Sequence, residues 1–336
     1  MQVSPGQRFE VIFRTKSVAQ LHGKTDYLIQ LETKDRPTVW YGYGVLRYSD
    51  STPSITKGPR NPPLKLSNAT YDWLEYTLEP LKPNNFPSAD EVTRRVTIYD
   101  RQVLTRTDIW RNNGNQWNES TIDATPGDKP YLVNIYEQGP AAVPDYEAAL
   151  DNKGWDPMTY TWPAKIGEVL EIIWVNTGSL VMDNGGVDYH PFHAHGGHYF
   201  DIGSKCYPRS SFSLKLMYSS GGNGTYDPVE NEKKLKGYNT VLRDTTSLYR
   251  YTAYTKAGMN AGWRGWRLRV EDAGVWMIHC YILQHMGIGM QTVWVMGEYD
   301  QMARIPEPYV AGYLDYGGSA YGNDSFAPSY VHQFGD

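Results

Sequence analysis

The sequence predicts an all-β protein built around a β-sandwich. Aromatic residues make up 14% of the 336 residues, and the chain carries 32 Gly and 21 Pro. Runs rich in aromatic and β-branched residues, separated by glycine and proline, are typical of short strands joined by turns. The sequence shows no heptad pattern, no long amphipathic helical run and no repeat of solenoid period. Coiled coils and solenoid repeats are therefore excluded.

The first fifty residues contain three runs rich in Tyr, Val and Ile: Phe9–Thr15, Asp26–Thr33 and Tyr41–Tyr48. This composition favours strands. A sandwich domain needs about seven strands and about 100 residues, so three strands do not close one. We therefore expect residues 1–50 to be part of an incomplete domain with an unpaired edge.

The remaining chain divides into a linker, a complete sandwich and a tail. Residues 51–87 contain seven prolines and are interpreted as a linker. Strand-like runs continue from Val92 to Met296, and we place a complete sandwich domain in residues 88–300. Residues 301–336 repeat Tyr, Gly and Ser, which predicts a C-terminal tail lying loosely over the surface.

Charge and hydropathy limit the partners. The formal net charge is −5 and the sequence pI about 5.9, so no basic face favours nucleic acid. No apolar run approaches the roughly 20 residues that span a bilayer, and the N-terminus does not resemble a signal peptide.

Two cysteines, Cys206 and Cys280, cannot form the framework of a disulfide scaffold. Four N-x-S/T sequons predict a glycoprotein: Asn68, Asn118, Asn223 and Asn323.

Cys280, His285 and Met290 follow one another at intervals of five residues. An electron-transfer copper uses two imidazoles and one thiolate in a plane, with a weak methionine sulfur on the axis. The second imidazole must come from the other histidine-rich segment, His190–His198, because the two segments hold six of the eight histidines. A lone buried cysteine is usually a small hydrophobic residue, but this regular spacing favours copper.

The residues around Cys280 are expected to be extended, because Val275–Ile278 is rich in strand formers. Successive side chains of a strand point to opposite faces. His279 and Tyr281 should then face away from the side that carries Cys280. One strand would serve two different sites.

The segments His190–His198 and Ile278–Met290 resemble the copper motifs of the third cupredoxin domain of multicopper oxidases, the laccase and ascorbate oxidase family. The resemblance implies a cupredoxin-like Greek-key β-sandwich. It implies a type 1 copper site with four ligands: His190, Cys280, His285 and Met290. It also assigns three histidines to a trinuclear copper cluster: His193, His195 and His279. Tyr281 stands where the family has a fourth histidine. In a cupin-like barrel, His193 and His195 would instead bind zinc or iron.

The resemblance covers essentially the whole chain and is strongest to filamentous-fungal, ascorbate-oxidase-like members, as in Gly237–Thr246 and Gly262–Val270. Pro5–Arg14 resembles the later part of the family's second domain. We therefore expect an N-terminally truncated member in which residues 1–50 end that second domain and the first cupredoxin domain is missing. Residues 205–221 are expected to be an insertion, either an ordinary surface loop or a retained intron.

The resemblance implies a copper-dependent oxidoreductase that takes single electrons from phenols, ascorbate or a similar small reductant. His285, Cys280 and His279 would carry the electrons to the cluster, where dioxygen is reduced to water. It also implies secretion. A neutral phenol with a pKa of about 10 replaces imidazole poorly, so Tyr281 and the missing first domain argue against full activity. The alternative is a non-catalytic single-copper or metal-free cupredoxin module.

Overall fold

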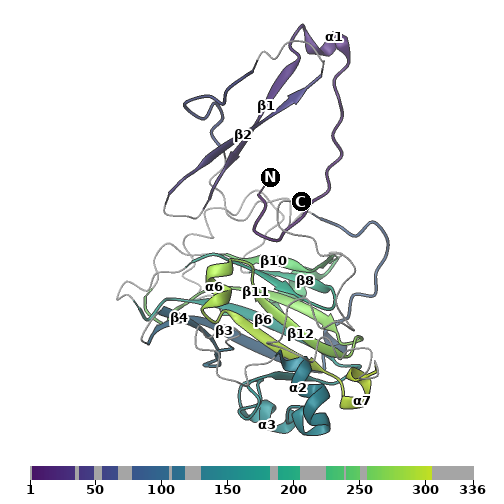
Figure 1. Cartoon of the computed structure of the whole chain (residues 1–336). Helices are drawn as coiled ribbons and strands as arrows, with labels where there is room; N and C mark the ends of the chain where they lie inside the picture. Colours follow the sequence, from purple (N-terminus) through teal and green to yellow (C-terminus); the bar gives the residue numbers. More distant parts are fainter. Residues whose placement is uncertain are drawn as a thin grey trace, which may run out of the picture. The chain divides into compact units, whose positions relative to one another are not determined.

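The protein is described by a computed structural model over residues 2–34, 38–48, 55–66, 78–105, 108–117, 130–181, 188–204, 225–237, 240–249 and 256–304 (Figure 1). The chain forms two compact units, one of Met1–Val3 with Arg8–Tyr76 and one of Ser4–Gln7 with Thr77–Asp336. The expected insertion at 205–221, Cys206, the four sequons and the tail beyond Arg304 lie outside the described residues.

The first unit contains one short helix, α1 (Val18–Leu21), and an antiparallel sheet of two strands, β1 (Asp26–Glu32) and β2 (Tyr41–Arg47). Both strands lie where the sequence predicts them. The expected strand at Phe9–Thr15 is wrong, because those residues form no strand in the structure. A strand-like composition becomes a strand only when a partner supplies the ladder.

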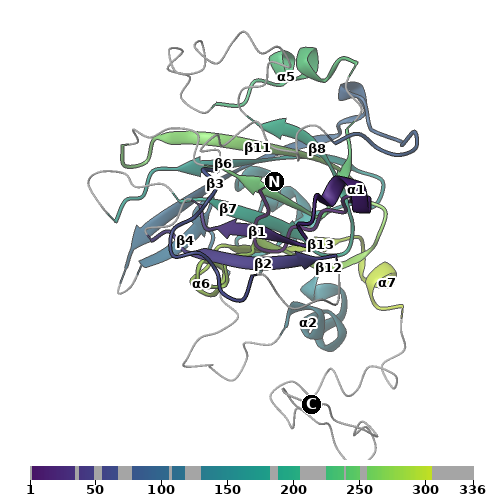
Figure 2. The ribbon, with the colours of Figure 1, turned by 90° about the horizontal axis from the view of Figure 1, so that it is seen from above.

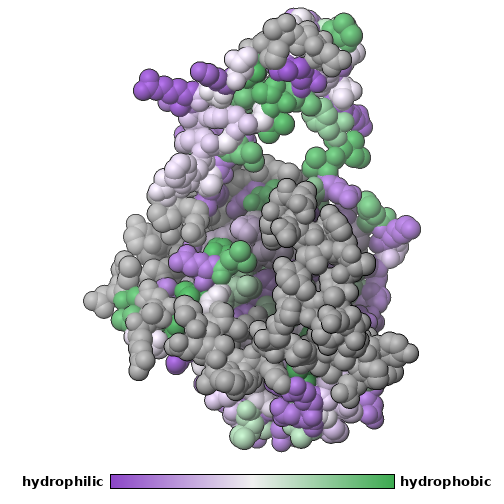
Figure 3. Space-filling view, in the orientation of Figure 1, coloured by the Kyte–Doolittle hydropathy of each residue, from purple (hydrophilic) through white to green (hydrophobic). Residues whose placement is uncertain are grey.

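Hydrophobic side chains lie on the surface of this unit, as Figure 3 shows. Ile29 is 53% exposed and Leu31 63% exposed, although both belong to β1. Among the described residues of this unit, no second layer covers this two-stranded sheet. The unit therefore derives little stability from apolar burial.

The second unit is a sandwich of two sheets, which confirms the predicted fold class (Figures 1 and 2). One sheet has the order β4-β3-β6-β11-β8-β9, with bounds Asp108–Asn112, Arg94–Leu104, Val169–Thr177, Asn260–Arg269, Tyr199–Ser204 and Leu242–Arg243. The other has the order β10-β7-β12-β13-β5, with bounds Thr245–Leu248, His190–Ala194, Gly274–Cys280, Gln291–Met296 and Trp162–Ala164.

Short helices occupy the connections. Their bounds are Ala89–Glu91 (η2), Tyr131–Gln138 (α2), Gly139–Ala142 (η3), Tyr146–Asp151 (α3), Pro228–Leu235 (α5), Leu283–Gly287 (α6) and Tyr299–Met302 (α7). In Figure 2, α5 lies outside the six-stranded sheet, and α2 and α7 lie outside the five-stranded sheet. Within the described residues, no helix has the length and apolarity to cross a bilayer.

The main core fills the space between the sheets and is rich in tryptophan. Trp162, Trp174 and Trp294 are each 0% exposed within it. β6, the strand between β3 and β11, is buried along its whole length. Large aromatic side chains dominate the burial energy of such a core. The same core contains Cys280 and Met290, so the functional residues are held by the best-packed part of the fold.

Candidate metal centre

Two neighbouring strands bring the histidine-rich segments together. β7 pairs antiparallel with β12, placing His193 opposite His279 and Phe192 opposite Cys280. Because side chains alternate along a strand, consecutive residues of β12 face opposite sides. The structure accordingly forms two separate groups of possible metal ligands at this place, one with Cys280 and one with His279.

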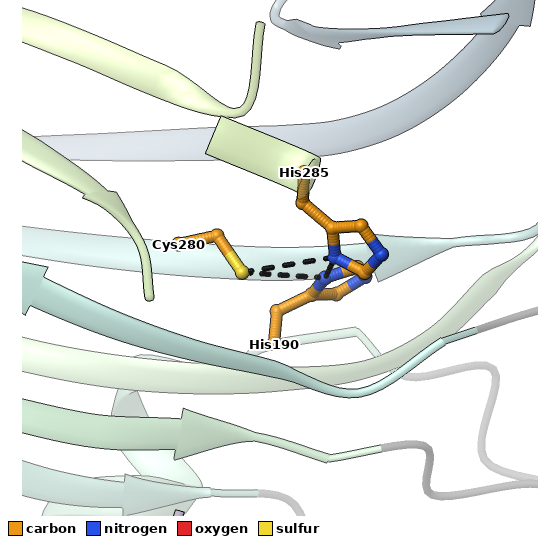
Figure 4. Close-up of side chains that lie close together, drawn as sticks. All are labelled: His190, Cys280 and His285. Carbon is orange, nitrogen blue, oxygen red and sulfur yellow. Dashed lines mark hydrogen bonds between the residues drawn. The ribbon is translucent and has the colours of Figure 1, made fainter. Parts of the chain in front are cut away.

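The first group consists of His190, Cys280 and His285 (Figure 4). The two Nδ1 atoms lie 3.1 Å apart. The Cys280 Sγ lies 3.9 Å from the Nδ1 of His190 and 3.8 Å from the Nδ1 of His285. His190 and Cys280 are 0% exposed and His285 7%. Three donor atoms thus converge in the buried interior.

A tight turn after β12 sets this geometry. The Cys280 N–H donates to the Met290 carbonyl at 3.0 Å, and the Met290 N–H donates to the His285 carbonyl at 2.9 Å. Gly289 has φ +108°, and a Cβ there would lie 2.6 Å from the carbonyl oxygen of Trp110. Only glycine meets both conditions. The five-residue spacing seen in the sequence is therefore the span of one closed turn.

Met290 belongs to the same environment. Its side chain is 0% exposed and packs in the main core with Cys280, Ile278 and Phe192. Its backbone is bonded to both Cys280 and His285. The structure therefore places all four residues that the sequence proposes for one copper in one buried region.

Asp188 orients the ring of His285. The His285 Nε2 lies 3.2 Å from the Asp188 Oδ2, so it donates there and its Nδ1 faces Cys280 and His190. Burial raises the pKa of Asp188, but the hydrogen bond from His285 and the nearby His190 lower it to about 2 overall. The carboxylate is therefore ionised at neutral pH. The sequence analysis missed Asp188, although it lies only two residues before His190.

Trp110 covers the two imidazoles of the first group. Its ring centroid lies 4.7 Å from that of His190 and 5.4 Å from that of His285. Trp110 is 3% exposed and belongs to β4. It is held there because its backbone N–H donates to the Ile288 carbonyl at 2.8 Å. No local pattern in the sequence links Trp110 to the histidines, and it was missed.

Burial controls the protonation of this group. It lowers the pKa of His190 well below its ordinary value, with the neighbouring His285 acting in the same direction. It raises the pKa of the Cys280 thiol. His190 is therefore a neutral imidazole, and Cys280 is a thiol that gives up its proton when a metal binds.

The three donor atoms fit a transition metal ion. A triangle with sides of 3.1, 3.9 and 3.8 Å has a centre about 2.1 Å from each corner, and metal–nitrogen and metal–sulfur bonds in proteins are about 2.0–2.3 Å. Two imidazoles with one thiolate are also the donor set of blue-copper sites. Both the spacing and the chemistry of the donors suit copper.

The second group consists of His193, His195 and His279, whose possible ligand atoms lie within 4.8 Å of one another. The Nε2 atoms of His195 and His279 are 3.2 Å apart. His193 and His279 each direct Nδ1 to a backbone carbonyl at 2.9 Å, of Asp244 and Cys280 respectively. Each therefore donates from Nδ1 and keeps the Nε2 lone pair for a metal.

Tyr281 lies beside this group, where the fourth histidine was expected. Its ring centroid is 5.2 Å from that of His193 and 5.5 Å from that of His279. The backbone N–H of Tyr281 donates to the Pro191 carbonyl at 2.6 Å. Gly6 lies against the phenol ring, since a Cβ there would be 2.3 Å from the Tyr281 Cδ2. The phenol is thus packed in place beside the histidines.

The second group is less enclosed than the first. His279 is 6% exposed, whereas His193 is partly exposed and His195 exposed. Burial lowers the pKa of His279 to about 4, and it also lowers the pKa of His195. His198 is exposed and belongs to neither group. The second group is therefore open to solvent at His193 and His195, whereas His279 is buried.

Comparison with known proteins shows the family to which the chain belongs. The sequence model of the multicopper oxidase family matches residues 99–300. Laccase-like multicopper oxidase 1 of Thermothelomyces thermophilus is 45% identical over 348 residues, covering 100% of this chain and 50% of that protein. Multicopper oxidase aurL2 of Gibberella zeae is 43% identical over 349 residues, covering 98% of this chain and 54% of that protein.

Among solved structures, the laccase of Botrytis aclada aligns with a TM-score of 0.49 at 16% identity, covering 81% of this chain and 39% of that chain. The chain spans about half the length of the curated relatives it matches.

Proposed function

Because the chain belongs to the multicopper oxidase family, whose membership implies copper binding, we propose that its sandwich holds a type 1 copper and accepts single electrons from a small reductant. The residues that would hold the copper are His190, Cys280, His285 and Met290. The observation that carries this proposal is the triangle of two Nδ1 atoms and one Sγ, with sides of 3.1, 3.9 and 3.8 Å. Copper bound there supplies one-electron redox chemistry.

The protein residues prepare the site in three ways. Burial keeps His190 neutral, so its lone pair is available at neutral pH. Asp188 accepts the Nε2–H of His285 and so directs the Nδ1 of that ring inward. Trp110 and Met290 exclude water from the three donors. Rigid, dry surroundings of this kind reduce the rearrangement that accompanies a change of charge.

The donor is proposed to be a phenol, ascorbate or a related small reductant, which delivers electrons near His285. This histidine lies in α6 between chain neighbours that face solvent, since Leu283 is 69% exposed. His285 is the first-group ligand with the greatest exposure, at 7%. An outer-sphere donor would therefore contact the protein at α6.

The electron path from the first group to the second is short, because Cys280 and His279 are consecutive residues of β12. Their side chains belong to different groups. A further contact joins them, since the His279 Nδ1 donates to the Cys280 carbonyl at 2.9 Å. We propose that, with copper bound at both groups, this connection would carry electrons from the first group toward the second.

A second candidate function is a single-copper electron carrier without oxygen chemistry, and Tyr281 favours it. The phenol lies where a fourth imidazole would serve the second group, and its ring already packs against Gly6 and His193. A neutral phenol is a weak metal ligand. With Tyr281 in this position, the second group offers three imidazoles.

Oxygen consumption by the copper-loaded chain with a phenolic donor separates the two functions. The proposed type 1 copper predicts a coloured protein that bleaches when the donor is added without air. If the bleached protein regains colour in air with stoichiometric oxygen uptake, the oxidase function holds. If it bleaches but takes up no oxygen, the chain is a single-copper carrier. A copper-loaded protein that never bleaches would contradict both.

A further inference from the structure

A cavity of about 620 Å³ opens on the six-stranded sheet, away from both histidine groups. It is lined mainly by β3, by the residues that follow β4 and by the end of α3 with its following turn. Five of its lining residues are basic: Arg94, Arg95, Arg101, Arg111 and Lys153. None of the described lining residues is acidic. Its volume falls within the range of about 300–1,000 Å³ that is usual for small-molecule sites.

Two of these cations, Arg94 and Arg95, lie beside carboxylates. Arg94 lies 3.8 Å from Glu168, and Arg95 lies 2.5 Å from Glu171. Among the described residues, Arg101, Arg111 and Lys153 form no ion pair. The Nε atoms of Arg101 and Arg111 are buried and have no hydrogen-bond partner within the part of the chain that the structure covers.

The strand register places Arg101 directly opposite Arg111, in the antiparallel pair of β3 and β4. Like charges opposite each other in a sheet destabilise it, by roughly 0.2–1 kcal/mol. An anion between the two guanidinium groups would remove that repulsion and satisfy donors that are otherwise unpaired. Arginine also matches the planar shape of a carboxylate, with two parallel N–H···O bonds.

Apolar side chains complete the lining. Leu150 is 45% exposed, Leu180 48% and Tyr99 40%, and Val103 lies beside them. These surfaces would lose contact with water if a ligand carried an apolar body. A bare inorganic anion would leave them uncovered.

We propose that this cavity binds a small organic carboxylate, with its charged end between Arg101 and Arg111 and its apolar body against Leu150, Leu180 and Tyr99. Lys153 adds a third positive charge at the rim. This basic cavity is separate from the copper ligands, so binding requires neither copper nor redox activity.

Isothermal titration of the full chain with benzoate tests this proposal. We expect one benzoate per chain, with equal affinity in the copper-free and copper-loaded protein. Arg101→Met and Arg111→Met should each weaken binding at least tenfold, because a charge-assisted hydrogen bond contributes about 1.5–3 kcal/mol. Arg269→Met is the matched control, since that guanidinium is bonded to Glu91 elsewhere, and it should leave binding unchanged.

Arg101→Lys and Arg111→Lys keep the charge but lose the planar fork, and they should weaken binding less than the methionine variants do. Thermal melting tests whether each variant is folded. If a methionine variant is not folded, the lysine variant at the same position replaces it. Absence of benzoate binding, equal affinity for benzyl alcohol, or unchanged affinity in the arginine variants would each overturn the proposal. Tighter binding of a hexaglutamate peptide than of benzoate would also overturn it, in favour of a polypeptide partner.

Discussion

The two groups of ligands share β7 and β12 but differ in how the fold encloses them. The first group, around Cys280, lies in the main core, and its three donors are at most 7% exposed. The second group, around His279, is less enclosed, since His193 is partly exposed and His195 exposed. The first has a donor set that suits a metal by itself. The second has a phenol, Tyr281, at its fourth position.

This difference shows how one strand can serve two kinds of chemistry. Alternation sends neighbouring side chains to opposite faces of the sheet, and burial then makes one face a closed site and leaves the other open. A closed site controls the metal through rigid protein ligands. An open site leaves some of its imidazoles in contact with solvent, as at His193 and His195.

Removing the thiolate is the strongest way to break the comparison. Cys280→Ser should abolish the visible absorption and reduce copper at the first group to near zero, because no other sulfur of the site can replace a thiolate. Absorption spectroscopy and copper analysis measure this. Cys206→Ser is the matched control and should keep both colour and copper. A coloured Cys280→Ser protein would refute the ligand assignment.

Weakening the support of His285 should give the next largest effect. Asp188→Asn keeps a similar shape but loses the negative charge that accepts the Nε2–H of His285. Loss of such a partner costs about 10- to 100-fold in metal affinity, while the colour of the copper-loaded protein should remain. Competition with a copper chelator measures the affinity. Asp145→Asn, at the start of α3, should leave it unchanged; an equal loss there would mean that Asp188 has no special role.

Restoring the fourth imidazole should make the two groups more alike. Tyr281→His places a nitrogen ligand beside His193 and His279, and we expect additional copper bound at the second group without a change in the visible band. Metal analysis of the variant, with Tyr281→Phe as control, measures the added copper. Equal copper content in the two variants would show that Tyr281 does not limit the second group.

A smaller effect is expected when Asp100 is replaced, and it concerns the stability of the core that holds the first group. Asp100 is 0% exposed and its carboxyl oxygens have no hydrogen-bond partner among the described residues. Burial raises the pKa of Asp100 well above its ordinary value. The native state therefore holds this proton more tightly than the unfolded chain does, and stability falls as pH rises above the ordinary aspartate pKa.

Asp100→Asn should remove this pH-dependent loss and stabilise the protein at neutral pH, by on the order of 1 kcal/mol. In the sheet, Asp100 of β3 lies opposite Asn112 of β4 and Asn176 of β6. The side-chain oxygens of these two residues also accept no hydrogen bond within the described residues. Denaturant unfolding at pH 5 and pH 8 measures the change. A variant that is less stable than the native protein at pH 8 would contradict this account.

Much of the site could be predicted from sequence because its signals are local. The interval from His285 to Met290 is closed by one backbone hydrogen bond, and the alternation of His279 and Cys280 follows from strand geometry alone. Asp188 and Trp110 were missed because their roles depend on packing between distant segments, as in the bond from Trp110 to Ile288. The ligand roles themselves stay predictions.

The fold shows the same division between local and distant signals. Composition indicated short strands joined by turns, the resemblance of the copper motifs implied the sandwich, and two of the three strands expected near the N-terminus are present. Phe9–Thr15 has the composition of a strand but pairs with none, and Ile12 is 94% exposed. Pairing is a property of two segments, which one segment's composition does not determine. The contact of Gly6 with Tyr281 is equally distant in the chain.

Copper content per chain, measured together with the visible spectrum of the copper-reconstituted protein, tests the central claim most directly. That claim is that the first group forms a complete type 1 site within this chain. We predict about one copper per chain with intense thiolate-to-copper absorption. Copper bound without that absorption, or no bound copper at all, would contradict it.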